Sequence, residues 1–168
     1  MILIAKQQKR QSARYGMVLP RFVRQALAGA PLTVYGDGTQ TRSFCHVFDV
    51  VDALTALIDH PVGVGDVFNI GNPAEITVLD LARTVIARTR SASDVTFVPF
   101  ADVFGDGFEE IYRRVPDITK ARAELGFFPS RTLESVIDDI AGAVTREPRQ
   151  EAAASLAMAG PHTGGAHV

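Results

Sequence analysis

The chain has 168 residues, 46% of them hydrophobic and 21% charged, which is enough for one domain with a buried core. Its formal net charge of −2 gives no electrostatic basis for binding nucleic acid or an anionic membrane. No run approaches the ~20 apolar residues of a transmembrane helix. We therefore expect a small-molecule partner, no nucleic acid and no membrane. With its single cysteine, we expect a cytoplasmic protein.

The two ends of the chain differ in composition from its middle. Two of the three lysines, Lys6 and Lys9, lie in the first nine residues, and no acidic residue precedes Asp37. From Glu147 onward the sequence is rich in Ala, Gly, Pro and His without apolar periodicity. We expect an atypical N-terminal segment at 1–14, one folded domain at 15–145 and a disordered tail at 146–168.

The first expected elements are a helix, a strand, a turn and a second strand. Apolar residues at helical spacing predict a helix over 17–28, which Pro31 keeps from continuing. Leu32 to Tyr35 is a short run typical of a strand, and the glycines of residues 36–38 predict a turn. An extended strand is expected to resume over 43–47.

The second half of the chain alternates helices and short strands. An apolar helix is expected over 48–60, and a strand over 66–70 whose continuous apolar character is typical of burial on both faces. Thr77 to Asp80 is a capping box, which predicts a helix over 78–90. The remaining elements are a strand at 95–98, a helix at 118–125 with Asp117 as its N-cap, and a last helix at 132–145.

Two strings that contain arginine carry the clearest chemical signal. The first runs from Leu32 to Phe44 and places Arg42 after the glycine-rich turn. The second, Arg113 to Asp117, follows about seventy residues later. A guanidinium is permanently charged and can donate two parallel N–H bonds to a phosphate. If folding brings Arg42 and Arg114 together, the pair suits a diphosphate.

Read together, the two strings resemble the substrate-binding half of the NAD-dependent nucleotide-sugar epimerases, dehydratases and decarboxylases, the extended branch of the short-chain dehydrogenase/reductases. The resemblance covers about residues 11–145. The strings at 35–44 and 68–72 are most similar to the UDP-glucuronate decarboxylases and UDP-glucose 4-epimerases. The resemblance implies an α/β fold, an incomplete extended short-chain dehydrogenase with a small mixed substrate-binding domain plus the last strand and helices of the Rossmann sheet. Residues 15–145 would then be a nucleotide-sugar-binding domain.

The same resemblance implies a set of substrate-binding residues for a UDP-sugar. In the family the positions of Arg42 and Arg114 meet the diphosphate, and that of Asp117 holds the ribose hydroxyls. Tyr35 would offer its ring to the base. The full set is Val18, Thr33, Tyr35, Arg42, Val78, Arg114 and Asp117. All of them except Thr33 have a simpler alternative: a surface position for the two arginines, a helix-capping role for Asp117, and core positions for Tyr35, Val18 and Val78.

The other half of such an enzyme has no counterpart in these residues. No Gly-x-x-Gly-x-x-Gly or Gly-x-Gly-x-x-Gly occurs, and the tyrosines at 15, 35 and 112 are followed four residues on by Leu19, Thr39 and Pro116 rather than lysine. The sequence therefore nominates no catalytic residue. We expect no cofactor to be bound by this chain alone, whereas NAD serves the complete family enzyme.

Three functions remain open from the sequence. The chain could be the substrate-binding portion of an NAD-dependent epimerase or decarboxylase, inactive alone and completed by a separate polypeptide that carries the dinucleotide-binding half. It could also be a non-catalytic nucleotide-sugar-binding module, or a structural protein that no longer binds a ligand. Whether the chain is an enzyme is therefore uncertain from sequence.

The resemblance also has a consequence for packing. In the family, the counterparts of 48–60 and 66–70 belong to the dinucleotide sheet. Without that sheet we expect their apolar faces to be exposed. The isolated chain should then be marginally stable, prone to association or dependent on another polypeptide. One substitute is a strand formed by Ile2 to Ala5 beside Val67 to Ile70.

Neither a metal site nor a thiol nucleophile is predicted. The four histidines are scattered, two of them in the last seven residues. Cys45 and His46 are neighbours, but on a strand adjacent side chains face opposite ways. We expect Cys45 to be a small apolar residue.

Overall fold

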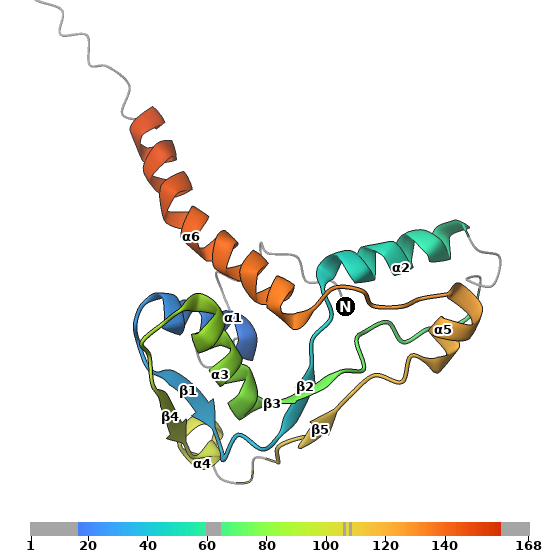
Figure 1. Cartoon of the computed structure of the whole chain (residues 1–168), viewed down its shortest axis with the longest axis horizontal. Coiled ribbons are helices and arrows are strands. Elements are labelled where there is room, and N and C mark those ends of the chain that lie inside the picture. Colours follow the sequence, from blue (N-terminus) through green and yellow to red (C-terminus); the bar gives the residue numbers. More distant parts are fainter. Residues whose placement is uncertain (1–16, 60–64, 106, 108, 159–168) are drawn as a thin grey trace, which may run out of the picture.

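The computed structural model describes residues 17–59, 65–105, 107 and 109–158, and it is a mixed α/β structure. Figure 1 shows the path of the chain. Its elements are α1 (Val18–Leu27), β1 (Leu32–Tyr35), β2 (Thr41–Ser43), α2 (Val47–Asp59), β3 (Glu75–Thr77), α3 (Val78–Thr89), β4 (Val95–Val98), α4 (Phe100–Phe104), β5 (Arg113–Arg114), α5 (Thr119–Leu125) and α6 (Leu133–Met158).

The strands form two small sheets. β1 and β4 pair in parallel, with Leu32 opposite Val95 and Tyr35 opposite Val98. The other sheet has the order β3-β2-β5, in which β2 is antiparallel to β3 and parallel to β5. In Figure 1 this three-stranded sheet lies between the group formed by α1, α3 and β1 and the pair formed by α2 and α5.

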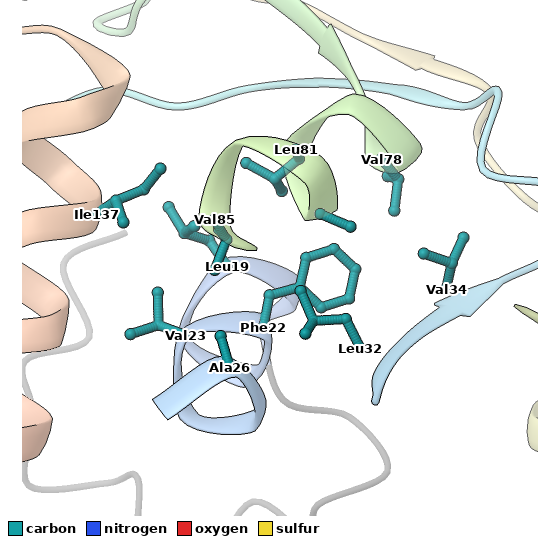
Figure 2. Close-up of a cluster of buried hydrophobic side chains, with 11 residues drawn as sticks. Leu19, Phe22, Val23, Ala26, Leu32, Val34, Val78, Leu81, Val85 and Ile137 are labelled. Carbon is teal, nitrogen blue, oxygen red and sulfur yellow. The ribbon is translucent and has the colours of Figure 1, made fainter. Parts of the chain in front are cut away.

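The main core lies where α1, α3 and α6 meet β1. Phe22 of α1, Leu81 of α3 and Ile137 of α6 have fully buried side chains. Figure 2 shows Phe22 between the two shorter helices, with Ile137 approaching from the third. The apolar residues of all three helices recur at helical spacing, so each helix presents one apolar face to the others.

A second, smaller core joins α2 to α5 and the segment that follows it. Its buried members are Ala53, Ile118, Ala121 and Phe127. Phe68 and Ile70 pack against them from the segment before β3. This cluster attaches residues 68–72 to the neighbourhood of Asp117 without any sheet pairing.

The predicted strand at 66–70 is wrong. Residues 66–70 have no regular secondary structure, and Val67 is 80% exposed instead of buried. An apolar run becomes a central parallel strand only where other strands supply its hydrogen bonds on both sides. The described residues offer this segment no such neighbour. The suggested pairing with Ile2 to Ala5 lies outside the described residues.

The strand expected at 43–47 is displaced toward the N-terminus. β2 covers Thr41–Ser43, and α2 begins at Val47. His46 stops the extended chain there, since its ring Nδ1 accepts a hydrogen bond from the Phe48 N–H at 3.2 Å. That bond satisfies one of the free N–H groups in the first turn of α2.

The last helix is longer than predicted. α6 runs to Met158 instead of ending near residue 145. The run contains Ala, Glu, Arg and Gln, which have high helix propensity even where no apolar stripe is present. Residues 159–168 lie outside the described part. None of the described helices is long and apolar enough to cross a bilayer.

Candidate functional site

The two arginines singled out by the sequence lie side by side. β2 and β5 are parallel neighbours, and Arg42 stands directly opposite Arg114. Side chains alternate between the faces of a sheet, and opposed residues of paired strands share a face. Arg42 and Arg114 therefore project from the same face of the sheet, which we call the arginine face. Arg113, one residue earlier, projects from the other face.

Arg113 has a partner on its own face. Its Nε donates to Glu75 Oε1 at 3.1 Å, and Thr41 Oγ1 donates to Glu75 Oε2 at 2.9 Å. The hydrogen bonds from Arg113, then from Thr41, hold the pKa of the Glu75 carboxyl below its usual value. Arg113 is thus a cation in an exposed structural ion pair, unlike its neighbour Arg114.

Arg42 is held by three acceptors. Its Nη1 donates to the carbonyl oxygens of Thr41 at 2.7 Å and Ile111 at 2.8 Å, and its Nη2 pairs with the Glu110 carboxylate. The side chains of Arg42 and Glu110 are only 19% and 15% exposed. The guanidinium therefore has a fixed position before any ligand arrives.

Arg114 is the freer member of the pair. Its residue is exposed, and within the described part of the chain its guanidinium has no hydrogen-bond or ion-pair partner. With Glu110 beside Arg42, the shared face still has one unpaired positive charge. This charge is available to an anion.

The glycine-rich loop before β2 is rigidly built. A Cβ on Gly36 would lie 2.2 Å from Cε2 of the Phe100 ring, and both Gly36 and Gly38 have positive φ angles of 71° and 79°. The first N–H groups of α3 donate to this loop: Val78 to Gln40 O and Leu79 to Gly38 O, both at 3.0 Å. The loop is thereby attached to the N-terminus of α3.

The same loop contains a local carboxylate turn. Asp37 Oδ1 accepts from the Thr39 N–H at 2.9 Å and from its hydroxyl at 2.7 Å. These bonds lower the pKa of Asp37 below its usual value. Such a turn fixes the loop in front of Arg42 without help from the core.

Thr33 and Tyr35 are held by two residues of α1. Thr33 exchanges hydrogen bonds with the Gln25 amide, at 2.9 Å from Nε2 to Oγ1 and 3.1 Å from the backbone N–H to Oε1. Arg21 Nη2 donates to Thr33 O at 3.0 Å, and its guanidinium carbon lies 4.0 Å from the centre of the Tyr35 ring. The Phe104 ring meets Tyr35 edge-on at 5.7 Å.

Val18 and Val78 belong to the wall of the main core. Val78 is 5% exposed and is a core member, and Val18 packs against the same cluster from the start of α1. Val78 also contacts the glycine-rich loop through its backbone, since its N–H donates to Gln40 O.

Asp117 lies between β5, which carries Arg114, and the start of α5. It is exposed, and its Oδ1 accepts from the Thr119 N–H at 2.9 Å. Hydrogen bonds from Thr119 lower the pKa of Asp117 below its usual value. The assigned N-cap is Ile118 rather than Asp117, but the carboxylate still satisfies the first N–H of α5.

The segment 69–72 sets the position of Asp117 and Pro116. Asn69 Nδ2 donates to Asp117 O at 3.1 Å. A Cβ on Gly71 would lie 2.7 Å from Pro116 Cγ, so glycine is required for this close approach. Residues distant in sequence thus fix the end of the string that carries Arg114.

A cavity of about 150 Å³ lies elsewhere, between α2 and the segment after α5. Its lining includes Asp49, Asp52, Phe127 and Phe128, and none of the seven predicted residues. Arg131 Nη1 already pairs with both carboxylates, with Asp49 at 2.7 Å and Asp52 at 2.9 Å. The cavity is therefore not part of the arginine face.

Cys45 and His46 have structural roles. Burial, then the charge of Asp49, raises the pKa of the Cys45 thiol to about 11, which leaves it protonated at neutral pH. The buried His46 contacts Asp139 Oδ2 through Nε2 at 3.0 Å and stacks on Phe48. Among the described residues, no cluster of potential metal ligands is found.

Among the described residues, the glycine turn before β2 does not have the geometry of a dinucleotide-binding turn. The turn at Gly36 and Gly38 leads into β2 and not into a helix, and the first N–H groups of α3 are occupied by the Gly38 and Gln40 carbonyls. A pyrophosphate of NAD needs such N–H groups free at the end of a helix that follows a glycine turn.

Two neighbours of the site were missed in the sequence. Arg21 covers one face of Tyr35, and Glu110 pairs with Arg42. Arg21 lies on a helix among core positions, so no motif marks it. Glu110 belongs to an ordinary acidic pair before β5, and only the folded register brings it to Arg42.

The sequence is similar to that of a known protein family and of characterised members of it. Residues 4–71 match the NAD dependent epimerase/dehydratase family. A UDP-N-acetyl-alpha-D-glucosaminuronate decarboxylase from Bacillus cytotoxicus is 43% identical over 120 residues, which are 71% of this chain and 37% of that protein. UDP-glucuronic acid decarboxylase 2 from Arabidopsis thaliana is 43% identical over 118 residues, which are 70% of this chain and 25% of that protein.

Solved structures give the same assignment. The epimerase Mth375 from Methanothermobacter thermautotrophicus matches with a TM-score of 0.71 and 26% identity, over 81% of this chain and 39% of that one. A UDP-glucuronic acid 4-epimerase from Bacillus cereus, in complex with UDP-glucuronic acid and NAD, matches with a TM-score of 0.67 and 27% identity, over 77% and 40%.

The chain therefore spans about two fifths, or less, of the length of these relatives. Its small sheets and helices are part of the extended short-chain dehydrogenase fold that these proteins share. By sequence and by fold, the chain belongs to the NAD-dependent epimerase/dehydratase family.

Proposed function

We propose that this chain binds the UDP part of a UDP-sugar and is the substrate-binding portion of an NAD-dependent nucleotide-sugar epimerase or decarboxylase. The observation that carries the proposal is the register of β2 and β5, which sets Arg42 opposite Arg114 on one face. Two guanidinium groups at neighbouring positions suit the two phosphates of a nucleoside diphosphate.

The seven predicted residues divide into four roles in this proposal. Arg42 and Arg114 contact the diphosphate, and Asp117 accepts hydrogen bonds from ribose hydroxyls. Thr33 and Tyr35 face the uracil, and Val18 and Val78 form the apolar support beside it. The Bacillus cereus relative whose structure contains UDP-glucuronic acid supports this ligand class.

The chain alone is proposed to bind no NAD and to be inactive. Its residues hold the nucleotide in place, which lowers the entropic cost of bringing the sugar to a reactive group. NAD supplies hydride transfer in the complete enzyme. We place this activity in the cytoplasm.

A polypeptide that carries the dinucleotide-binding half is the proposed partner. The described part of α2 exposes Val47 (61%), Phe48 (54%), Val51 (45%) and Ile58 (83%). These side chains form the exposed apolar face of α2, as expected from the sequence. An apolar surface of this kind favours contact with another protein surface. Coexpression of the chain with such a half should give a complex, and UDP-sugar turnover with NAD would establish a split enzyme.

Calorimetry with UDP and UDP-glucuronate tests the binding site. We expect Arg42→Ala and Arg114→Ala each to weaken UDP binding about tenfold or more, since a hydrogen bond to a charged group contributes about 1.5–3 kcal/mol. Arg113→Ala is the matched control, because it removes the same charge one residue away on the opposite face. Equal affinity in all three variants and the wild type would exclude this site.

A second candidate is a structural protein that has lost ligand binding. The existing pairing of Arg42 with Glu110 favours it, since this arginine already has an anionic partner. It predicts no rise in melting temperature with UDP, whereas a ligand at 100 times its Kd stabilises the folded state by about 2.7 kcal/mol. A non-catalytic nucleotide-sugar-binding module differs from both, since it binds UDP yet gains no activity from any dinucleotide-binding partner.

A further inference from the structure

Arg42 uses only part of its hydrogen-bonding capacity within the chain. A guanidinium has five N–H donors. Both Nη1 donors go to the Thr41 and Ile111 carbonyls, and one Nη2 donor goes to Glu110. Among the described residues, no partner is found for the Nε–H or for the other Nη2–H. Neighbouring Nε and Nη2 donors of an arginine can together bind one phosphate.

Burial makes the contact with Glu110 the decisive one. The two side chains are less than one fifth exposed, so water does not readily replace the carboxylate. The two carbonyls hold only the Nη1 end. Glu110 is the side chain that keeps Nη2 in place and so sets the direction of the free edge.

We propose that Glu110 is the positioning residue for Arg42, holding its guanidinium so that the Nε–Nη2 edge faces the diphosphate. This inference rests on the proposed function. Glu110 touches no ligand in it and acts through Arg42. The excess charge on the face comes from Arg114, which has no partner among the described residues. Glu110 therefore fixes geometry, and Arg114 supplies the unpaired attraction.

The alternative to positioning is that Glu110 competes with a phosphate for Arg42. If Glu110 occupied the place of a phosphate, removing its charge would free Arg42 and tighten binding. Positioning needs the reach of the side chain and its acceptor oxygen. Competition needs its negative charge.

Two substitutions separate reach from charge. Glu110→Asp keeps the charge but is shorter by one methylene, and Glu110→Gln keeps the length and an acceptor oxygen but loses the charge. By calorimetry with UDP and with inorganic diphosphate, we expect E110D to weaken binding about tenfold and E110Q to stay within about threefold of wild type. Glu109→Asp is the matched control and should change nothing.

A double-mutant cycle gives a readout that a merely structural role would not move. In an Arg42→Ala background, Glu110→Asp should cause no further loss of affinity. An additional tenfold loss there would overturn the inference, as would tighter binding by E110Q or unchanged binding by E110D.

A spectroscopic measurement keeps this test independent of UDP binding. In nitrogen-detected NMR spectra, the Nη signals of Arg42, assigned by their loss in Arg42→Ala, should be resolved in wild type and E110Q and averaged by rotation in E110D. If wild type binds no UDP, the proposed function fails, yet these signals still decide the role of Glu110. Averaged Nη signals in the wild type would overturn it.

Discussion

Single residues at the arginine face owe their positions to contacts that span the sequence. Arg114 projects beside Arg42 because β5 pairs with β2. Two residues later, Pro116 packs so close to the backbone of residue 71 that only glycine fits there. Phosphate recognition depends on such fixed placement, because an arginine that must first be ordered loses part of its binding energy to entropy. The face is thus set by backbone packing as much as by charge.

Gly71→Ala should disturb the arginine face by displacing Pro116. The new Cβ would lie 2.7 Å from Pro116 Cγ, and a proline ring cannot rotate away, so the string from Arg114 to Asp117 must shift. We expect destabilisation of about 1–3 kcal/mol, as for other overpacked sites, together with weaker UDP binding. Thermal unfolding and calorimetry measure the two effects.

Gly142→Ala is the control for that substitution. Gly142 lies inside α6, and the nearest side-chain atom to its added Cβ is Arg146 Nη1 at 3.4 Å. Alanine has the higher helix propensity, so the melting temperature should stay the same or rise. Unchanged stability and affinity in the Gly71 variant would contradict the argument from close approach.

Asp49 gives the molecule a specific sensitivity to acid. Burial alone would raise its pKa, but hydrogen bonds from Ser130 and Arg131 outweigh that effect and hold the pKa below its usual value. A carboxylate with a lowered pKa in the folded state stabilises fully above its unfolded pKa of about 3.9. That stabilisation is lost as the pH falls through the folded value.

Asp49→Asn should remove this part of the pH dependence. We expect a loss of about 1–3 kcal/mol near pH 7, and a smaller difference from wild type as the pH falls below about 4. Asp52→Asn is the control, since Asp52 binds the same Arg131 but its side chain is 67% exposed, so about 1 kcal/mol or less is expected. Unfolding curves between pH 3 and 7 show whether the two variants differ.

At the scale of elements, local patterns predicted what local forces decide. The helices over α1, α2, α3 and α5 and the strands β1 and β4 agree with the sequence to within a few residues, because apolar spacing and end signals act over single turns. The segment 66–70 failed since a strand depends on neighbours that sequence patterns do not show. β5 has only two residues and no apolar pattern of its own.

The candidate site was predictable in part for the same reason. Arg42 and Arg114 could be chosen from their strings, but their register, the pairing of Glu110 and the cover of Tyr35 by Arg21 all depend on tertiary contacts. The capping box was also half right. Thr77 Oγ1 accepts the Asp80 N–H at 3.0 Å, but the Asp80 carboxylate accepts from the Thr77 hydroxyl and not from a free backbone N–H.

Thr77→Ala should loosen the start of α3, to which the glycine-rich loop is attached. Loss of an N-cap costs about 1 kcal/mol, with a range of about 0.5–2. Thr84→Ala is the control, because Thr84 lies inside the same helix and only donates to Asp80 O at 2.8 Å. Hydrogen exchange of the Val78 and Leu79 amides, which bind the loop, should accelerate in the first variant alone. Equal exchange rates in the two variants would show that the attachment of the loop does not depend on the Thr77 cap.

At the scale of the whole molecule, two cores of unequal size share one chain. The larger joins α1, α3 and α6. The smaller joins α2 and α5 and leaves Val47, Val51 and Ile58 of α2 exposed. A domain's stability of about 5–15 kcal/mol is comparable with the burial of a few large apolar side chains. The exposed apolar face of α2 therefore represents stability that a covering protein would add.

Ile58→Lys should reduce self-association of the isolated chain without weakening its fold. Ile58 is 83% exposed, so the lysine displaces no core contact and the melting temperature should stay within a few degrees of wild type. Thr55→Lys is the matched control, since it adds the same charge to an exposed polar position of α2 and removes no apolar surface. Light scattering and binding of a hydrophobic dye should fall in the Ile58 variant and much less in the Thr55 variant. Equal decreases would assign the association to net charge, and a wild-type chain that stays monomeric and binds no dye would mean that this face needs no partner.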